Sequence, residues 1–109
     1  MHELSITRNI VSIVSERAAG RPVRRIHLRI GALAGIEVGA IEFCFGMCTE
    51  GTALEGAELV VHEVEGRGEC ERCGEQMQLQ HLVALCQCER RAPLRIVAGE
   101  ELLIQSMEL

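Results

Sequence analysis

Cys70-Glu71-Arg72-Cys73, followed after twelve residues by Cys86-Gln87-Cys88, is the stretch around which the chain is organised. It holds four of the six cysteines. Two close cysteine pairs separated by a short loop are typical of a tetrahedral metal site, and structural zinc sites are closed by four such ligands. The glycine that follows the first pair suits the tight turn of a knuckle, because glycine tolerates positive φ. The spacing therefore predicts a zinc knuckle.

The second pair leaves the exact ligand set open. Cys86-Gln87-Cys88 is one residue shorter than the usual Cys-x-x-Cys, and His81 in the same loop could replace one cysteine. Free or disulfide-linked thiols are the alternative to a metal, but close pairs in a reducing compartment are more often metal ligands. A redox role for Cys70 and Cys73 lacks the strand-to-helix context that lowers a thiol pKa.

Composition limits the size of the core and the available chemistry. A length of 109 residues indicates one domain, or a small domain with an inserted metal loop. Phe43 and Phe45 are the only aromatic residues, so the core must be aliphatic, and a metal would help to stabilise it. The chain has no Asp, Lys, Trp or Tyr. Paired aspartates and a lysine Schiff base are therefore excluded, and we expect no enzyme.

Charge and hydropathy narrow the partners and the location. The formal net charge of −5 argues against a nucleic-acid module, which needs excess Lys and Arg. No apolar stretch reaches membrane-spanning length. The start, Met-His-Glu-Leu-Ser, lacks the basic head and apolar run of a signal peptide. We therefore expect a cytoplasmic protein that binds neither nucleic acid nor membrane.

Apolar periodicity predicts two helices and a small sheet. Residues 4–19 have helical spacing and end at Gly20 and Pro22, and residues 37–49 have helical spacing again. Residues 23–30, 59–64 and 102–107 read as strands. Residues 77–85 fit a short strand pair or an irregular segment. We expect an α+β fold: two helices packed on a small three-stranded antiparallel sheet, with an inserted zinc-knuckle, zinc-ribbon-like domain.

Further details follow from the same spacing. We expect the first helix to turn one apolar face toward the core. That face comprises Leu4, Thr7, Val11, Val14 and Ala18, widened by Ile6, Ile10 and Ile13. We expect the first strand to have one solvent-facing side, which comprises Arg25, His27 and Arg29. The two strands that flank the cysteine loop are expected to pair as an antiparallel hairpin.

Cys44 and Cys48 are spaced i, i+4 in the second predicted helix and could share a metal. The favoured interpretation is that they are small buried hydrophobic residues.

The amino terminus offers a second set of metal ligands. The terminal amine of Met1 has a pKa of about 7.7–8.0, so it can act as a ligand near neutral pH. The amine, the next amide nitrogen and the ring of His2 can chelate one ion, and Glu3 can add its amide or carboxylate. Nitrogen-rich, near-planar sites suit Ni(II) or Cu(II). By spacing alone, a solvated histidine is the more common alternative.

Several segments together resemble one family. The segments are the opening Met-His-Glu-Leu-Ser-Ile, the segment Arg25-Ile-His-Leu-Arg-Ile-Gly-Ala-Leu-Ala-Gly-Ile-Glu, the segment Glu50-Gly-Thr-Ala-Leu-Glu-Gly-Ala-Glu-Leu, the cysteine loop and the closing Gly-Glu-Glu-Leu-Leu-Ile-Gln-Ser-Met-Glu-Leu. They are similar to the hydrogenase/urease nickel-incorporation proteins of HypA/HybF type. The resemblance covers essentially the whole chain in order. One departure is clear: the family's second pair is usually Cys-Pro-x-Cys followed by Gly, whereas this chain has Cys86-Gln87-Cys88-Glu89.

The resemblance implies a nickel metallochaperone for maturation of [NiFe] hydrogenase or urease. It implies Ni(II) ligands at Met1, His2 and Glu3, and structural zinc held by Cys70, Cys73, Cys86 and Cys88. Residues 1–66 and 98–109 would form the nickel-binding domain, with residues 67–97 as the inserted zinc-binding domain. Implied partners are a nickel-handling GTPase and the hydrogenase large subunit or urease accessory proteins, with the protein a monomer or homodimer. The alternative is a zinc-ribbon interaction module without a nickel role.

Overall fold

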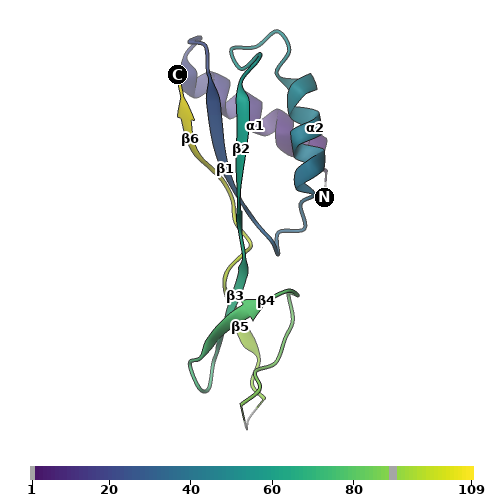
Figure 1. Cartoon of the computed structure of the whole chain (residues 1–109), viewed down its shortest axis with the longest axis vertical. Helices are drawn as coiled ribbons and strands as arrows, with labels where there is room; N and C mark the ends of the chain where they lie inside the picture. Colours follow the sequence, from purple (N-terminus) through teal and green to yellow (C-terminus); the bar gives the residue numbers. More distant parts are fainter. Residues whose placement is uncertain (1, 89–90) are drawn as a thin grey trace.

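Two lobes lie end to end in an elongated molecule of 57 × 22 × 17 Å (Figure 1). The computed structural model describes residues 2–88 and 91–109. The first lobe contains α1 (Glu3–Ala18), β1 (Arg25–Gly31), α2 (Val38–Cys48), β2 (Glu58–Val64) and β6 (Leu102–Glu108). The second contains β3 (Gly66–Cys70), β4 (Gln76–Leu79) and β5 (Leu94–Ala98). The predicted helices and strands are confirmed to within two residues at each end, and the α+β class is confirmed.

The sheet of the first lobe is mixed, with strand order β2-β1-β6. β1 pairs with β6 antiparallel but with β2 parallel, so the prediction of an antiparallel sheet was wrong for one pair. The reason is α2, which carries the chain back across the sheet between β1 and β2 in a crossover connection. The expected hairpin between the strands flanking the cysteine loop was also wrong, because β1 lies between β2 and β6.

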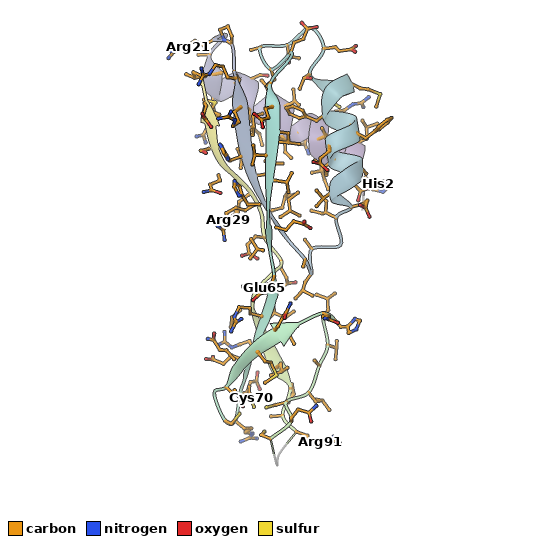
Figure 2. All side chains as sticks on the ribbon, viewed as in Figure 1. His2, Arg21, Arg29, Glu65, Cys70 and Arg91 are labelled. Atoms are coloured by element: carbon orange, nitrogen blue, oxygen red, sulfur yellow. The ribbon has the colours of Figure 1, made fainter. Side chains whose placement is uncertain are left out.

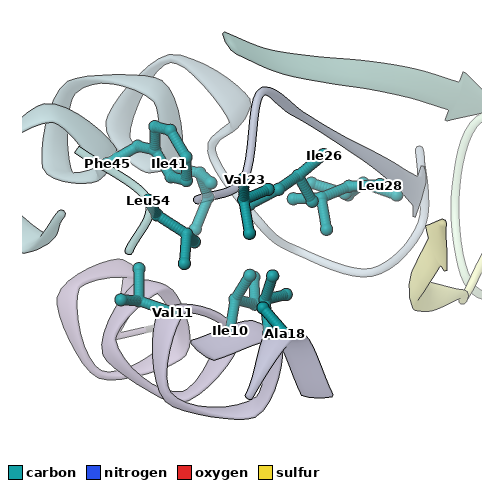
Figure 3. Close-up of a cluster of buried hydrophobic side chains, with 11 residues drawn as sticks. Ile10, Val11, Ala18, Val23, Ile26, Leu28, Ile41, Phe45 and Leu54 are labelled. Atoms are coloured by element: carbon teal, nitrogen blue, oxygen red, sulfur yellow. The ribbon is translucent and has the colours of Figure 1, made fainter. Parts of the chain in front are cut away.

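One face of this sheet is buried and the other faces solvent. Ile26, Leu28 and Ile30 of β1 are almost fully buried and share one core cluster with residues of both helices. Figure 3 shows Ile26 and Leu28 in this cluster. Each such side chain contributes about 1.5–3 kcal/mol of hydrophobic stabilisation. The predicted helix face is confirmed by buried Thr7, Ile10, Val11, Val14 and Ala18. Leu4 and Ile13 were placed wrongly: they are 41% and 47% exposed, at the margins of the stripe.

The helix α2 buries a narrower face than expected. Ile41 and Phe45, one turn apart, point into the core. Cys44 and Cys48 are half-buried rather than buried, and Cys48 packs against the edge of the core. Neither cysteine belongs to a group of three or more potential metal ligands among residues 2–88 and 91–109. Neither described helix has the length and apolar character needed to cross a membrane.

The second sheet has strand order β4-β3-β5 and is antiparallel throughout. β3 was not predicted, because Gly-Arg-Gly-Glu-Cys has no apolar alternation. Its glycines are required by close packing: a Cβ on Gly66 would lie 2.5 Å from the Leu79 carbonyl oxygen. Of the two readings of residues 77–85, the structure has part of β4 followed by an irregular segment. This lobe has its own small buried cluster around Cys70, Leu79, Cys86, Ala92 and Leu94.

Candidate metal sites

The four cysteines of the loop come together at the end of the second lobe. Cys70 ends β3, Cys73 lies in the turn that follows, and Cys86 and Cys88 lie in the irregular segment before β5. Their four sulfur atoms all lie within 4.8 Å of one another. Cys70 and Cys86 are buried, Cys88 is half-buried and Cys73 is exposed. The fold thus gathers sulfurs separated by up to eighteen positions in sequence.

The sulfur separations fit a tetrahedral ion. Cys70 Sγ lies 3.8 Å from Cys88 Sγ, and Cys73 Sγ lies 3.7 Å from Cys86 Sγ. Four Zn–S bonds of about 2.3 Å at tetrahedral angles give sulfur separations of about 3.8 Å. The observed distances are far longer than a disulfide bond of about 2.05 Å, so neither of these two pairs is joined by a disulfide. The group therefore has the donor chemistry and the spacing of a structural zinc site.

The backbone of the first knuckle is arranged around Cys70. The N–H groups of Arg72 and Cys73 both donate to Cys70 Sγ at 3.4 Å, and Gly74 adopts φ +74°. The hydrogen bond from the Cys73 N–H, supported by that from the Arg72 N–H, lowers the pKa of Cys70 to about 6. It does so although burial acts in the opposite direction. A thiolate is the form that binds metal. Cys70 therefore presents a ready anionic ligand at neutral pH.

In the second knuckle, backbone hydrogen bonds join both cysteines to residues just before β5. The Cys86 N–H donates to the Ala92 carbonyl, and the Arg91 N–H donates to the Cys88 carbonyl, both at 2.9 Å. Arg91 itself adopts positive φ, +45°. Glu89, where the family motif has glycine, lies outside the described residues. The turn thus closes on an arginine in the left-handed region.

The pKa of Cys86 is raised, whereas that of Cys70 is lowered. The Cys88 N–H lowers the pKa of Cys86, but burial and hydrogen bonding with the neighbouring thiols outweigh it and raise that pKa to about 12. Without a cation, this thiol keeps its proton. A divalent ion would displace the proton, because coordination stabilises the thiolate. His81, the alternative ligand, is exposed and does not belong to the ligand group.

The amino-terminal candidates lie in the other lobe (Figure 2). Met1 lies outside the described residues. His2 is the N-cap of α1 and exposed, and its carbonyl accepts the first helical hydrogen bond, from Ile6 N–H at 3.1 Å. Its ring makes no capping hydrogen bond. The imidazole therefore faces solvent beside the helix terminus rather than stabilising the helix.

Glu3 is held by a residue that sequence analysis missed. The Glu3 carboxylate accepts a hydrogen bond of 3.1 Å from the backbone N–H of Glu37, just before α2. This hydrogen bond lowers the pKa of Glu3, which keeps the carboxylate ionised at neutral pH. Glu37 is 34 positions away in sequence, so only the packing of α1 against α2 reveals the contact. The start of α1 is thereby fixed next to the start of α2.

Comparison with known proteins gives consistent matches over the full length. The family model for hydrogenase/urease nickel incorporation, metallochaperone HypA, matches residues 1–109. The hydrogenase maturation factors HypA of Rippkaea orientalis and Geobacter metallireducens are 46% and 44% identical over 109 residues; the alignments cover the whole chain and 96% and 99% of those proteins. Two solution structures share the fold: the Ni metallochaperone HypA from Helicobacter pylori (TM-score 0.68, 19% identity, 100% of this chain and 97% of that one) and a HypA protein (TM-score 0.71, 21% identity, 100% and 96%).

Proposed function

Because the chain belongs to the HypA family of hydrogenase/urease nickel-incorporation metallochaperones, we propose that it binds Ni(II) at its amino terminus and delivers it for [NiFe] hydrogenase maturation. Membership of this family confirms the sequence resemblance and the prediction of a non-catalytic protein. The observation that carries the nickel site is the start of α1, where an exposed His2 ring is followed directly by an ionised Glu3. The client could also be urease, as the family description includes both.

The proposed nickel ligands are the amine of Met1, the amide and ring nitrogens of His2, and Glu3. Imidazole and amine nitrogens are suitable Ni(II) donors. A metallochaperone must also release its cargo. Ligands from adjacent residues at a chain terminus can detach one after another, and protonation of the amine or the His2 ring weakens binding as pH falls. These residues therefore suit transient binding.

Nickel titration of the full chain tests this site. We expect His2→Ala to weaken Ni(II) binding at least tenfold in isothermal titration calorimetry, because the chelate loses its ring nitrogen. The matched control is His81→Ala, which removes a loop imidazole and should leave the affinity unchanged. Residues fused before Met1 should have the effect of His2→Ala. Equal nickel affinity in wild type and His2→Ala would refute the site, and a wild type that binds no Ni(II) would favour a zinc-ribbon interaction module.

For the second lobe we propose structural Zn(II) bound by Cys70, Cys73, Cys86 and Cys88. The support is the donor set and the sulfur spacing described above. Purified protein should contain about one zinc per chain by elemental analysis. Cys73→Ser should lose it, because three thiolates leave the tetrahedral site open. Cys44→Ser on α2 is the control and should retain zinc; zinc retained by Cys73→Ser would contradict the assignment.

We propose that the chain forms two domains with separate roles: a nickel domain of residues 1–66 and 98–109, and a zinc domain of residues 67–97. Separate sheets and separate buried clusters support this division. The zinc domain is proposed to dock the partner proteins: the nickel-handling GTPase, the hydrogenase large subunit or urease accessory proteins. Leu82, Val83 and Leu85 between the cysteine pairs are exposed apolar residues of the kind that mark interfaces. Leu82→Ser/Val83→Ser should weaken GTPase binding in calorimetry; unchanged binding would refute this docking surface.

We also propose that the protein works in the cytoplasm. Close cysteine pairs that form no disulfide are compatible with a reducing compartment. Fractionation of cells that express the untagged chain tests this, and recovery of the protein outside the cytoplasmic fraction would contradict it.

A further inference from the structure

The solvent-facing side of the main sheet carries a hydrogen-bonded row of three side chains from three strands. His27 lies on β1, His62 on β2 and Glu108 on β6. His27 Nε2 lies 2.7 Å from Glu108 Oε2, and His27 Nδ1 lies 3.0 Å from His62 Nε2. The parallel register puts His62 opposite Arg29, so the two histidines are diagonal neighbours on one face. Neither the core nor the sites described above use this row.

The two imidazoles face each other edge to edge. Their planes differ by only 14°, and their centres are 5.3 Å apart. The contact between the two nitrogens is 3.0 Å long. The ring centres can then be 5.3 Å apart only when the two centres and the two nitrogens lie nearly on one straight line. Stacked rings with the same contact would have closer centres. The ring nitrogens of His27 and His62 therefore point at each other across a short gap.

The carboxylate end of the row is firmly placed. Arg25 Nη1 contacts Glu108 Oε1 at 3.0 Å, and Arg25 Nε contacts Glu58 Oε2 at 2.9 Å. The hydrogen bond to His27, together with that to Arg25, lowers the pKa of Glu108 and keeps it ionised. Glu108 thus accepts the Nε2 proton of His27 and leaves Nδ1 with a lone pair. The charge of Arg25 is shared between two carboxylates.

We propose that His27 and His62 form a second binding site for a divalent transition-metal ion, with Glu108 orienting His27. A histidine that binds a metal through one ring nitrogen commonly donates its other N–H to a carboxylate, which fixes the tautomer. The pair His27 and Glu108 already has that arrangement. Imidazole nitrogen suits Ni(II), Zn(II) and Cu(II).

The spacing of the two nitrogens fits adjacent coordination positions. An ion about 2.0–2.1 Å from two nitrogens that are 3.0 Å apart makes an N–ion–N angle of about 91–97°, close to the angle between neighbouring ligands in octahedral or square-planar coordination. The lone pair of His27 Nδ1 points at the present position of His62 Nε2, so the ion would lie in that direction and His62 must swing aside until its own lone pair meets the ion at the adjacent position. The ring proton of His62 moves to Nδ1, so that both rings stay neutral. His62 is exposed on edge strand β2, and the hydrogen bond of its ring among the described residues is the one to His27. Tilting it therefore breaks one hydrogen bond, and water completes the coordination.

This site is independent of the proposed amino-terminal one, since it shares none of its residues. Two protein nitrogens and several waters make an open, exchangeable site, unlike the closed set of four cysteines. It is thus a site for a labile ion, on a face where a partner could reach it.

A nickel titration observed by imidazole NMR of the full, zinc-loaded His2→Ala chain tests the proposal. Octahedral Ni(II), the form expected with two imidazole nitrogens and several waters, is paramagnetic and broadens the signals of nearby nuclei. We expect the ring signals of His27 and His62 to broaden at Ni(II) concentrations at least tenfold below those that affect His81. The exposed His81 ring serves as an internal control for adventitious surface binding.

Two carboxylate variants provide the matched pair. Glu108→Gln should weaken the response of His27 by 10–100-fold, the usual effect of removing a carboxylate behind a metal-bound histidine. Glu58→Gln should leave it unchanged, because Glu58 contacts Arg25 and neither histidine. His62→Gln, at an exposed position, should abolish the response. Broadening of all three rings at the same Ni(II) concentration, or an unchanged response in His62→Gln, would overturn the proposal. Failure of the amino-terminal site would be seen separately, as unchanged nickel affinity in His2→Ala.

Discussion

Ala19 is a residue in a backbone conformation that its side chain disfavours. It follows the last residue of α1 and adopts φ 52° and ψ 44°, the left-handed region, while its N–H closes the helix on the Glu16 carbonyl. The sequence suggested that the helix would end at Gly20, but the turn begins one residue earlier. A Cβ in this region costs roughly 1–2 kcal/mol. Arg91 in the second knuckle carries the same kind of strain.

Ala19→Gly should therefore stabilise the protein. We expect the free energy of unfolding to rise by about 0.5–1 kcal/mol, because relief of the left-handed strain exceeds the entropy that glycine adds to the unfolded chain. Urea unfolding followed by circular dichroism measures the change. Ala18→Gly, one residue earlier, is the matched control and should destabilise, since Ala18 is helical and buried. A loss of stability in Ala19→Gly would show that this strain is absent.

At the scale of elements, a glycine in β3 is needed for close packing, whereas a glycine in α2 only destabilises its helix. A Cβ at Gly66 would meet the Leu79 carbonyl oxygen at 2.5 Å and the Leu33 side chain at 2.7 Å. A Cβ at Gly46, inside α2, would meet nothing within 4 Å. The first glycine permits strand β3 to approach its neighbours. The second only lowers the intrinsic stability of a helix.

The same substitution should therefore change stability in opposite directions. Gly46→Ala should raise the free energy of unfolding by about 0.5–1 kcal/mol. Gly66→Ala should lower it by at least about 1 kcal/mol, since the clash involves backbone and forces the strands apart. Thermal unfolding of zinc-loaded protein measures both. Equal effects of the two substitutions would contradict the close packing of β3 against β4.

The helices and the first strand could be predicted because their burial follows local periodicity. Ile26, Leu28 and Ile30 alternate with polar residues, and that pattern alone identifies the buried face. β3 could not be predicted, because its pairing depends on glycines that create space for neighbours rather than on apolar side chains. The cysteine group was foreseen from spacing. The contact of Glu3 with Glu37 was not, because it depends on how two helices meet.

The pairing of the strands also limited what the sequence could reveal. An antiparallel hairpin between residues 59–64 and 102–107 would have left β1 elsewhere. The observed parallel register of β1 and β2 places His27 near His62, and the antiparallel register of β1 and β6 places it near Glu108. None of the three residues is close to another in sequence. Only the order of strands in the sheet brings them together.

At the scale of the whole molecule, the two lobes have separate cores and a narrow connection. The larger core contains residues of both helices and β1, while the smaller one includes three of the four proposed zinc ligands, Cys70, Cys86 and the half-buried Cys88. The chain crosses between lobes where β2 leads into β3 and β5 leads into β6. Leu33, which follows β1, packs into the smaller cluster. So small a core needs a metal to remain ordered.

Zinc removal should therefore unfold one lobe and spare the other. With a strong chelator, we expect backbone amides of β3, β4 and β5 to lose hydrogen-exchange protection, while those of β1 and α1 keep it, because the larger aliphatic core contains no proposed zinc ligand. Hydrogen exchange followed by mass spectrometry measures both lobes at once. Cys73→Ser should behave like the chelated wild type, and the chelator should not change it further. Simultaneous loss of protection in β1 would mean that the lobes fold as one cooperative unit, and then the loss of zinc would also disturb the proposed nickel site at the start of α1.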